Sequence, residues 1–304
     1  MNDTKAVKAV KIKKDNVSHV ISILSYIMVT IFAVLCLLPF IMMVSASFSN
    51  ENTIMSEGVG FLPKNVSLTA YKIAFSAPQE LGGAYLVTIG MTAIGTPIGL
   101  FLIAMTGYVL QRKDFFLRNK ISYYIYFTTL FSAGLAPTYL WIVRYLNLKN
   151  NYLAVLLPAM MTPWLIFLMK NFMKSIPFEV TESGKIDGAG DFRIFVSLIL
   201  PMLKPALATV GLFLALSYWN EWYNAMLYLP NVKYTTLQYY LYKIVNTASA
   251  LKQSVAGANV SVGMLPTQTL KMATAVLATG PIIFLYPFVQ KYFISGITVG
   301  AVKG

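Results

Sequence analysis

The 304-residue sequence has a single cysteine, a single histidine and few charged residues. One cysteine, Cys36, excludes a disulfide framework, and a small apolar residue of a membrane helix is its simplest role. The lone histidine, His19, leaves too few imidazole and thiolate ligands for a typical zinc site. Charged residues make up only 12% of the chain, about half their usual share in soluble domains. Hydrophobic residues make up 57%, which predicts a membrane protein.

Several catalytic motifs are missing as well. There is no G-x-x-x-x-G-K-[ST] segment, so the chain has no P-loop for ATP phosphates. There is no H-E-x-x-H pair for a metalloprotease, and one histidine in a basic tail offers no hydrolase base. Carboxylates are nearly absent from the apolar runs, which argues against a proton-relay pump. The sequence therefore disfavours a membrane enzyme, and no catalytic, cofactor-binding or metal-binding residue is predicted.

Six apolar runs are long enough to cross a bilayer, which takes about 20 residues each. The runs are continuous rather than alternating, so helices are favoured over a barrel. We predict an all-α membrane protein with six transmembrane helices, which run from about Val20 to Phe48, Ala84 to Leu110, Ile121 to Leu146, Tyr152 to Met173, Ala206 to Leu229 and Leu270 to Phe293.

The first run has an alternative interpretation as a cleaved signal peptide. A basic segment precedes it, and Val44-Ser-Ala46 resembles a cleavage site. The run is longer than the 7–15 apolar residues of a signal peptide, however, so we expect an uncleaved span.

The lysines and arginines predict the orientation. Sixteen of the 24 would lie on one side of a six-span chain, and this is the cytoplasmic side by the positive-inside rule. They are Lys5, Lys8, Lys11, Lys13, Lys14, Arg112, Lys113, Arg118, Lys120, Lys170, Lys174, Lys185, Arg193, Lys204, Lys291 and Lys303. The net charge of +13 is thus a topology signal, and no nucleic-acid partner is expected.

Both termini are therefore predicted to be cytoplasmic (N-in/C-in). Residues 1–19 form a basic tail, residues 20–294 the six-helix domain, and residues 295–304 a C-terminal tail. Two long loops, 49–83 and 230–269, would lie outside. They either contact an extracellular partner or link helices.

A polar segment, residues 176–204, connects the fourth and fifth runs. Pro177 suits a first helical turn and Ser175 an N-cap. Gly188 suits a C-terminal cap, and Asp191 could cap a second helix. These residues predict a helix-turn-helix on the cytoplasmic face. A plain re-entry loop explains them nearly as well, because caps occur in any helix.

This segment resembles the EAA motif of binding-protein-dependent ABC importer permeases. That motif reads E-A-A, three residues, G, nine residues and I-x-L-P, and the sequence has both spacings in Glu182-Ser-Gly184, Gly188 and Leu198-x-Leu200-Pro201. Ser183, Gly184 and Leu198 depart from the motif but stay small or apolar. Gly184 would soften the first helix, since an interior glycine costs about 1 kcal/mol.

Two further features are similar to the carbohydrate (MalG-like) branch of this family. Trp219-Asn-Glu221-Trp222 resembles its W-N-E-[FW] stretch, and the segment 287–304 resembles its ending, G-x-V-K-G. The amino-acid sequence of that ending is similar to the endings of the LplC and YtcP type, whose permeases are associated with complex or uronic-acid-containing oligosaccharides. The resemblance covers residues 20 to about 304.

The resemblance implies a type I ABC importer permease fold and a transport subunit without its own ATPase site. Its implied partners are a second homologous permease subunit, a cytoplasmic ABC ATPase dimer that binds ATP and Mg, and an extracellular solute-binding protein. The implied substrate is an oligosaccharide, and the implied location is the bacterial cell membrane. The alternative function is an ion-coupled secondary carrier, which would need inverted repeats and charged midplane sites that the sequence does not display.

The same resemblance assigns the candidate site residues. Those for ATPase coupling are Glu182, Ser183, Gly184, Ile186, Asp187, Gly188, Ala189, Leu198, Leu200 and Pro201. Those for the substrate pathway are Trp219, Asn220, Glu221, Trp222, Tyr139 and Trp141. Glu221 is the one carboxylate clearly within a predicted span. It either contacts the pathway or the binding protein, or makes a structural hydrogen bond near the outer interface, and we favour the structural role.

Overall fold

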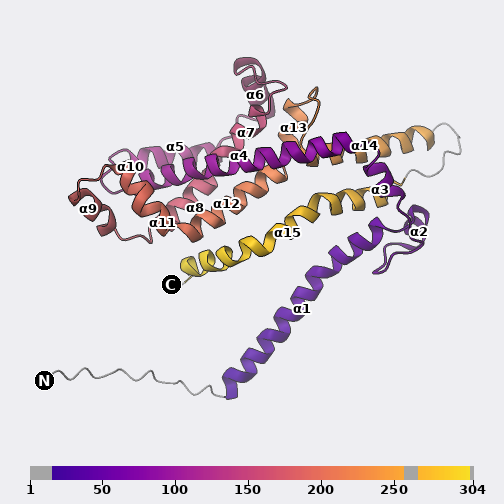
Figure 1. Ribbon diagram of the computed structural model, residues 1–304, viewed down its shortest axis with the longest axis horizontal. Helices are drawn as coiled ribbons and strands as arrows, with labels where there is room; N and C mark the ends of the chain where they lie inside the picture. The colour runs from indigo at the N-terminus through magenta and orange to yellow at the C-terminus, as the bar shows by residue number, and fades with distance from the viewer. Residues whose placement is uncertain (1–15, 257–265, 302–304) are drawn as a thin grey trace.

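The computed structural model describes residues 16–256 and 266–301, which form helices joined by loops, with no strand among them (Figure 1). The predicted all-α class is therefore confirmed. Residues 1–15 of the predicted N-terminal tail and residues 302–304 of the predicted C-terminal tail lie outside the described residues.

The centre of the molecule is a bundle of α4 (Pro78–Gln111), α8 (Pro163–Met173) and α12 (Lys204–Trp219), with α7 (Leu153–Met160) beside them. Their buried side chains form one apolar core. Gly95 of α4 permits close packing, because a Cβ there would lie 2.6 Å from the Tyr218 ring. The Tyr218 hydroxyl in turn donates to the Leu156 carbonyl at 2.9 Å. Gly95 thus serves a contact between α4 and α12.

Three predicted spans are present as long apolar helical segments: Val20–Ser47, Pro78–Gln111 and Leu153–Met173. A fourth candidate is a bent pair, Asp191–Met202 followed by Lys204–Trp219, whose two parts meet at 87°. The sixth predicted run lies within α15 (Thr267–Ala301).

The third predicted run is broken. Helix α5 (Arg118–Leu130) ends before Gly134, whose φ is +86°, and α6 (Leu135–Leu140) then continues into a π-helical turn, η1 (Trp141–Tyr145). Glycine adopts this φ freely, and Pro137 has no N–H to donate to the preceding turn. The local sequence thus explains the break.

The fifth predicted run is also shorter than expected. Helix α12 ends at Trp219, and a separate helix, α13 (Tyr223–Tyr228), follows. The Asn220 side-chain amide donates to the Leu216 carbonyl at 2.9 Å, a local bond that competes with continuation of the helix. Glu221 therefore lies in a break between helices rather than within a span.

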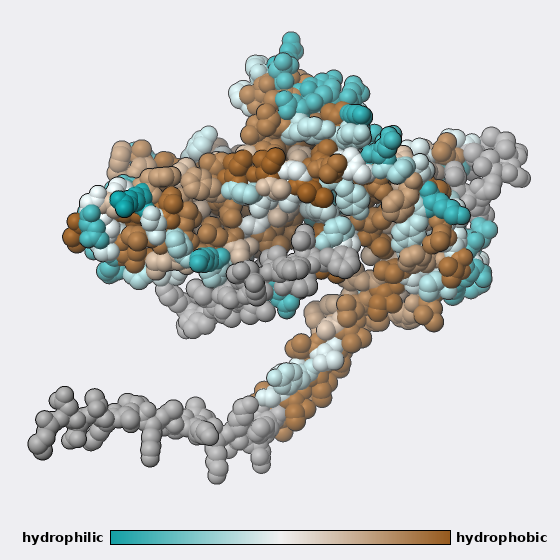
Figure 2. All heavy atoms as spheres, in the orientation of Figure 1, coloured by the Kyte–Doolittle hydropathy of each residue, from teal (hydrophilic) through white to brown (hydrophobic). Residues whose placement is uncertain are grey.

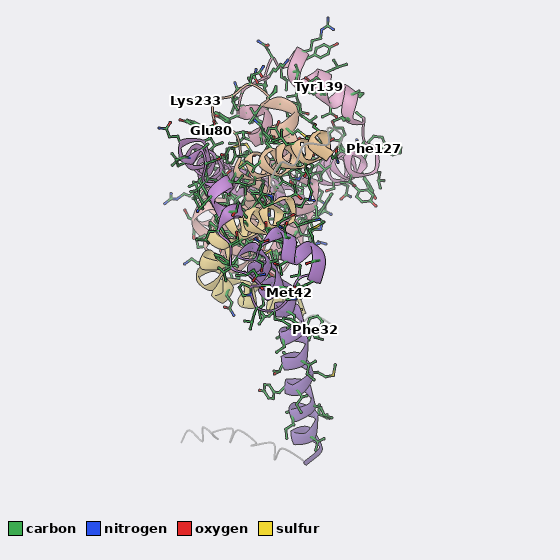
Figure 3. All side chains as sticks on the ribbon, turned by 90° about the vertical axis from the view of Figure 1, so that its right-hand side faces the viewer. Phe32, Met42, Glu80, Phe127, Tyr139 and Lys233 are labelled. Atoms are coloured by element: carbon green, nitrogen blue, oxygen red, sulfur yellow. The ribbon has the colours of Figure 1, made fainter. Side chains whose placement is uncertain are left out.

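Helix α1 (Asn16–Ser47) projects away from the bundle (Figure 1). Figure 2 shows apolar side chains along its length, and Phe32, labelled in Figure 3, is 69% exposed. Within Val20–Ser47, an 18-residue apolar window has no buried residue. Such a helix requires lipid or another membrane chain to cover it.

The connecting elements gather at two opposite ends (Figure 1). One end holds α9 (Glu179–Ile186), α10 (Asp191–Ile194), a π-helical segment η2 (Phe195–Ile199) and α11 (Leu200–Met202). The other end holds α2 (Glu51–Glu57), α3 (Thr69–Ala74) and much of α14 (Leu237–Ala256). The first set of candidate site residues lies at the α9 end, whereas α6 and α13, which carry or adjoin residues of the second set, project from the middle of the bundle (Figure 1).

Candidate functional site

Helix α9 carries the first part of the motif and ends in a glycine cap. Gly188 has a φ of +74° and donates its N–H to the Lys185 carbonyl at 3.0 Å. The Ala189 N–H donates to the Gly184 carbonyl at 2.9 Å. These two bonds are the Schellman pattern, so the predicted C-terminal cap at Gly188 is confirmed. Asp187 is the last residue before it.

The predicted N-terminal caps are wrong. The Ser175 hydroxyl donates to the Phe172 carbonyl at 2.7 Å, back into the preceding helix. Helix α9 begins only at Glu179, two residues after Pro177, and no side chain caps it. Asp191 is the first residue of α10 rather than its cap. Its carboxylate is engaged by an arginine, which is a stronger partner than a backbone amide.

The inner face of α9 packs on the following helical segment through Gly184. A Cβ at Gly184 would lie 2.9 Å from Ile194 Cγ1 and 3.1 Å from Leu198 Cδ1. The residue that was expected to soften the helix therefore permits its close packing. Ala189 and Leu200 are half-buried against the same core, while Pro201 is exposed in the first turn of α11.

The outer face of α9 is exposed and mixed in polarity, as the left end of Figure 2 shows. The Ile186 side chain is 85% exposed, and Glu182, Ser183 and Asp187 are exposed beside it. The Ser183 hydroxyl donates to the Val180 carbonyl at 3.1 Å. Within the described part of the chain, the Glu182 carboxylate accepts no hydrogen bond. The face is therefore available to another protein.

Four charged residues fasten α9 and α10 to the end of α4. Arg112 pairs with Asp114 and with Asp191, the latter at 2.6 Å between Nη1 and Oδ1. Lys185 of α9 pairs with Asp114 at 2.9 Å. Hydrogen bonds from Arg112 and Lys185 hold the pKa of Asp114 well below its usual range, so the carboxylate stays charged. We call these four residues the ion cluster.

The ion cluster was not predicted from the sequence. Lys185 and Asp114 are 71 residues apart. Arg112 and Lys185 were interpreted only as topology signals and Asp191 only as a helix cap, and Asp114 carried no prediction. Neither spacing nor motif indicated that the α4–α5 connection meets the α9 turn.

The second group of candidates, Trp219 to Trp222, lies at the far end of α12. Buried Trp219 donates its Nε1–H to the Ala278 carbonyl of α15 at 3.0 Å. The Glu221 carboxylate accepts from the Asn224 backbone N–H at 2.8 Å and from the Asn224 side-chain amide at 2.9 Å. These bonds cap the start of α13. Asn220 and Trp222 are exposed.

Tyr139 and Trp141 occupy another region. Tyr139, labelled in Figure 3, stacks on Tyr228 of α13 with ring centroids 5.9 Å apart. Trp141 is 57% exposed and contacts the Tyr145 ring of its own turn. Tyr139 is thus joined to α13, whereas Trp141 is not joined to the Trp219–Trp222 group by any contact among the described residues.

Sequence reasoning missed a buried carboxylate, Glu51, at the start of α2. It is only 6% exposed and accepts hydrogen bonds from the N–H groups of Gln268 and Thr269 at 2.9 and 2.8 Å. Lys252 Nζ lies 4.0 Å from it. A carboxylate at a helix N-terminus is electrostatically favourable, and Glu51 holds the first turn of α15 in this way.

Comparison with known proteins places the chain in a family. No family model matches the sequence. It is 37% identical over 287 residues to the polygalacturonan/rhamnogalacturonan transport system permease protein YtcP of Bacillus subtilis, a match that covers 94% of this chain and 99% of that protein. It is 35% identical over 268 residues to the protein LplC of the same organism, covering 88% and 90%.

A solved structure is similar as well. The crystal structure of a bacterial ABC transporter involved in the import of the acidic polysaccharide alginate contains a chain with 31% identity and a TM-score of 0.73. The alignment covers 92% of this chain and 98% of that one. Similarity over nearly the whole length, in sequence and fold, shows that this integral membrane protein belongs to the family of sugar ABC transporter permeases, which are transport components rather than enzymes.

Proposed function

We propose that the chain is one of two permease subunits of a bacterial importer for uronic-acid-containing oligosaccharides, driven by ATP hydrolysis on a separate ATPase dimer. The observation that carries the proposal is α9. Its inner face is packed on Ile194 and Leu198, its end is fixed by the Schellman cap, and its outer face exposes Ile186 and Glu182. A rigid helix with a free outer face suits docking to a cytoplasmic partner.

The contacts around α9 supply a route for motion. A displacement of α9 reaches α10 and η2 through the packing at Gly184, and it reaches α4 through the ion cluster. Interfaces of packed helices move as units rather than deforming continuously. In this proposal the ATPase, with its ATP and Mg, moves α9, and α9 moves two helices of the bundle.

The substrate class is argued from the relatives. YtcP is named for polygalacturonan and rhamnogalacturonan, and the similar crystal structure is of an importer of an acidic polysaccharide. We infer an acidic oligosaccharide for this chain, delivered by an extracellular solute-binding protein. Nothing in the described residues favours the ion-coupled carrier, and membership of the permease family speaks against it.

The test is transport by the assembled complex in proteoliposomes, with trigalacturonate as the probe. Glu182→Lys places the wrong charge on the docking face, and Gly188→Pro removes the N–H that completes the cap. Both variants are expected to remain in the membrane and to lose most substrate-stimulated ATP hydrolysis and uptake. Glu80→Lys, the same charge reversal at an exposed position in the first turn of α4, is the matched control. Wild-type uptake by Glu182→Lys would exclude α9 as the docking helix.

A further inference from the structure

A hollow of about 270 Å³ opens beside the start of α13, between α14 and α15. It lies in the half of the molecule opposite α9 (Figure 1). Its lining is amphipathic and includes Trp222, Gln238, Leu241, Tyr242, Lys271 and Thr274. Ligand sites typically combine an aromatic or apolar wall with a few polar groups that fix orientation, in volumes of about 300–1,000 Å³. This hollow is just below that range, the size for one unit of a chain.

Two aromatic rings form one wall. Trp222 and Tyr242 have ring centroids 4.9 Å apart at an interplanar angle of 35°. They are 39% and 42% exposed, whereas the neighbouring Trp219 is buried. Large rings that stay uncovered at a hollow offer apolar area together with a polar edge, which suits the apolar face of a sugar ring.

Lys271 supplies a cation at the same hollow. It is exposed in the second turn of α15, and no carboxylate of the described residues lies within ion-pair distance of it. Two lysines in the same half of the molecule are engaged by carboxylates: Lys252 lies 4.0 Å from Glu51, and Lys64 lies 3.1 Å from Glu57. A lysine without a carboxylate partner can bind an anion without first breaking an ion pair.

An amide and a hydroxyl group also line the hollow, beside apolar residues. The Gln238 side-chain amide reaches Asn220 of the candidate pathway at 3.4 Å, and Thr274 lies one turn beyond Lys271. Polar and ionised groups are costly against lipid acyl chains. The hollow is therefore suited to a polar occupant.

We propose that this hollow binds one acidic sugar unit of the transported chain, with the ring against Trp222 and Tyr242 and the carboxylate at Lys271. The inference rests on the proposed function for its substrate class and adds the residues that recognise it. Because Lys271 is positively charged, the hollow should bind an anionic saccharide more tightly than a neutral one.

The experiment is a titration of the assembled transporter, without binding protein, followed by tryptophan fluorescence. The two probes are trigalacturonate and its trimethyl ester, which has the same sugar rings but carries three neutral methyl ester groups in place of three carboxylates. Lys271→Gln is expected to weaken trigalacturonate binding about tenfold, as loss of a bond to a charged group does, and to leave ester binding unchanged. Added salt weakens trigalacturonate binding to the wild type. Trp222→Ala is expected to weaken the binding of both probes.

The matched control is Lys243→Gln, an exposed lysine of α14 that lies over the Tyr239 ring and not in the hollow. It is expected to bind both probes as the wild type does. Unchanged trigalacturonate binding by Lys271→Gln, or an equal loss for acid and ester, overturns the proposal.

Uptake in proteoliposomes separates the two proposals. Specific binding that depends on Lys271, in a complex that imports no acidic oligosaccharide, supports the hollow and contradicts the proposed function. Normal import with no Lys271-dependent binding overturns the hollow and leaves the proposed function standing.

Discussion

Glu51 connects two segments that are far apart in the chain, the start of α2 and the start of α15. Burial raises its pKa, but hydrogen bonds from Gln268 and Thr269 and the charge of Lys252 outweigh burial, so the net pKa is lowered from its ordinary value of 4.5. A lowered folded-state pKa stabilises the fold at pH values above the ordinary one. This stabilisation is lost as the pH falls through the lowered pKa.

We expect Glu51→Gln to lower the free energy of unfolding by about 1–3 kcal/mol at pH 7, because one charged acceptor of two N–H groups becomes a neutral one. The difference between variant and wild type should shrink below the ordinary pKa. Thermal unfolding in detergent at pH 7 and at pH 4 measures both effects.

Glu57→Gln, on the same helix, is the control. Its carboxylate pairs with Lys64 and is 59% exposed, and exposed pairs contribute roughly 0–1 kcal/mol. A Glu51→Gln protein no less stable than Glu57→Gln would contradict the role given to Glu51.

Among the elements, α9 depends on α4 through Arg112. The Arg112 side chain is 11% exposed, and its guanidinium holds Asp114 and Asp191 together. In Arg112→Ala the two carboxylates would lose the guanidinium between them. Asp114 would keep only its ion pair with Lys185. We expect α9 to detach from the α4–α5 connection and to become accessible to trypsin at Lys185, with a loss of coupled uptake.

The neighbouring Lys113→Ala is the control, since Lys113 is exposed and outside the ion cluster. Trypsin cleavage rates at Lys185 compare the two variants directly. Equal protection of Lys185 in Arg112→Ala and in the wild type would show that the packing at Gly184 alone holds α9.

The sequence predicted some local features correctly and missed the tertiary contacts. Long apolar runs identified three spans, and the spacing of Gly188 identified its cap, because both depend on neighbouring residues. The breaks at Gly134 and Asn220 were missed, since hydropathy does not register backbone conformation. Arg112, Glu51 and the hollow at Lys271 were missed because each depends on contacts between distant parts of the chain.

For the whole molecule, orientation remains the main prediction of the lysine and arginine pattern. The chain offers a clean test, since Cys36 is its one cysteine. In a Cys36→Ala background, a cysteine at exposed Asp187 should react with a membrane-impermeant maleimide only in inside-out vesicles. A cysteine at Asn65 in the α2–α3 loop should react only in right-side-out vesicles. Reaction of both from one side would contradict the predicted number of spans.

The bend of 87° between α11 and α12 has a mechanical consequence. Helix α12 has 16 residues and is therefore about 24 Å long. Acting as a lever, it would turn a tilt of about 10° at the bend into a displacement of about 4 Å at its far end. That far end is Trp219, which is bonded to Ala278 in the wall of the hollow. If an ATPase docks on α9 as proposed, a sugar held in the hollow would change the affinity of α9 for that ATPase by the same factor as docking changes the affinity of the hollow for the sugar.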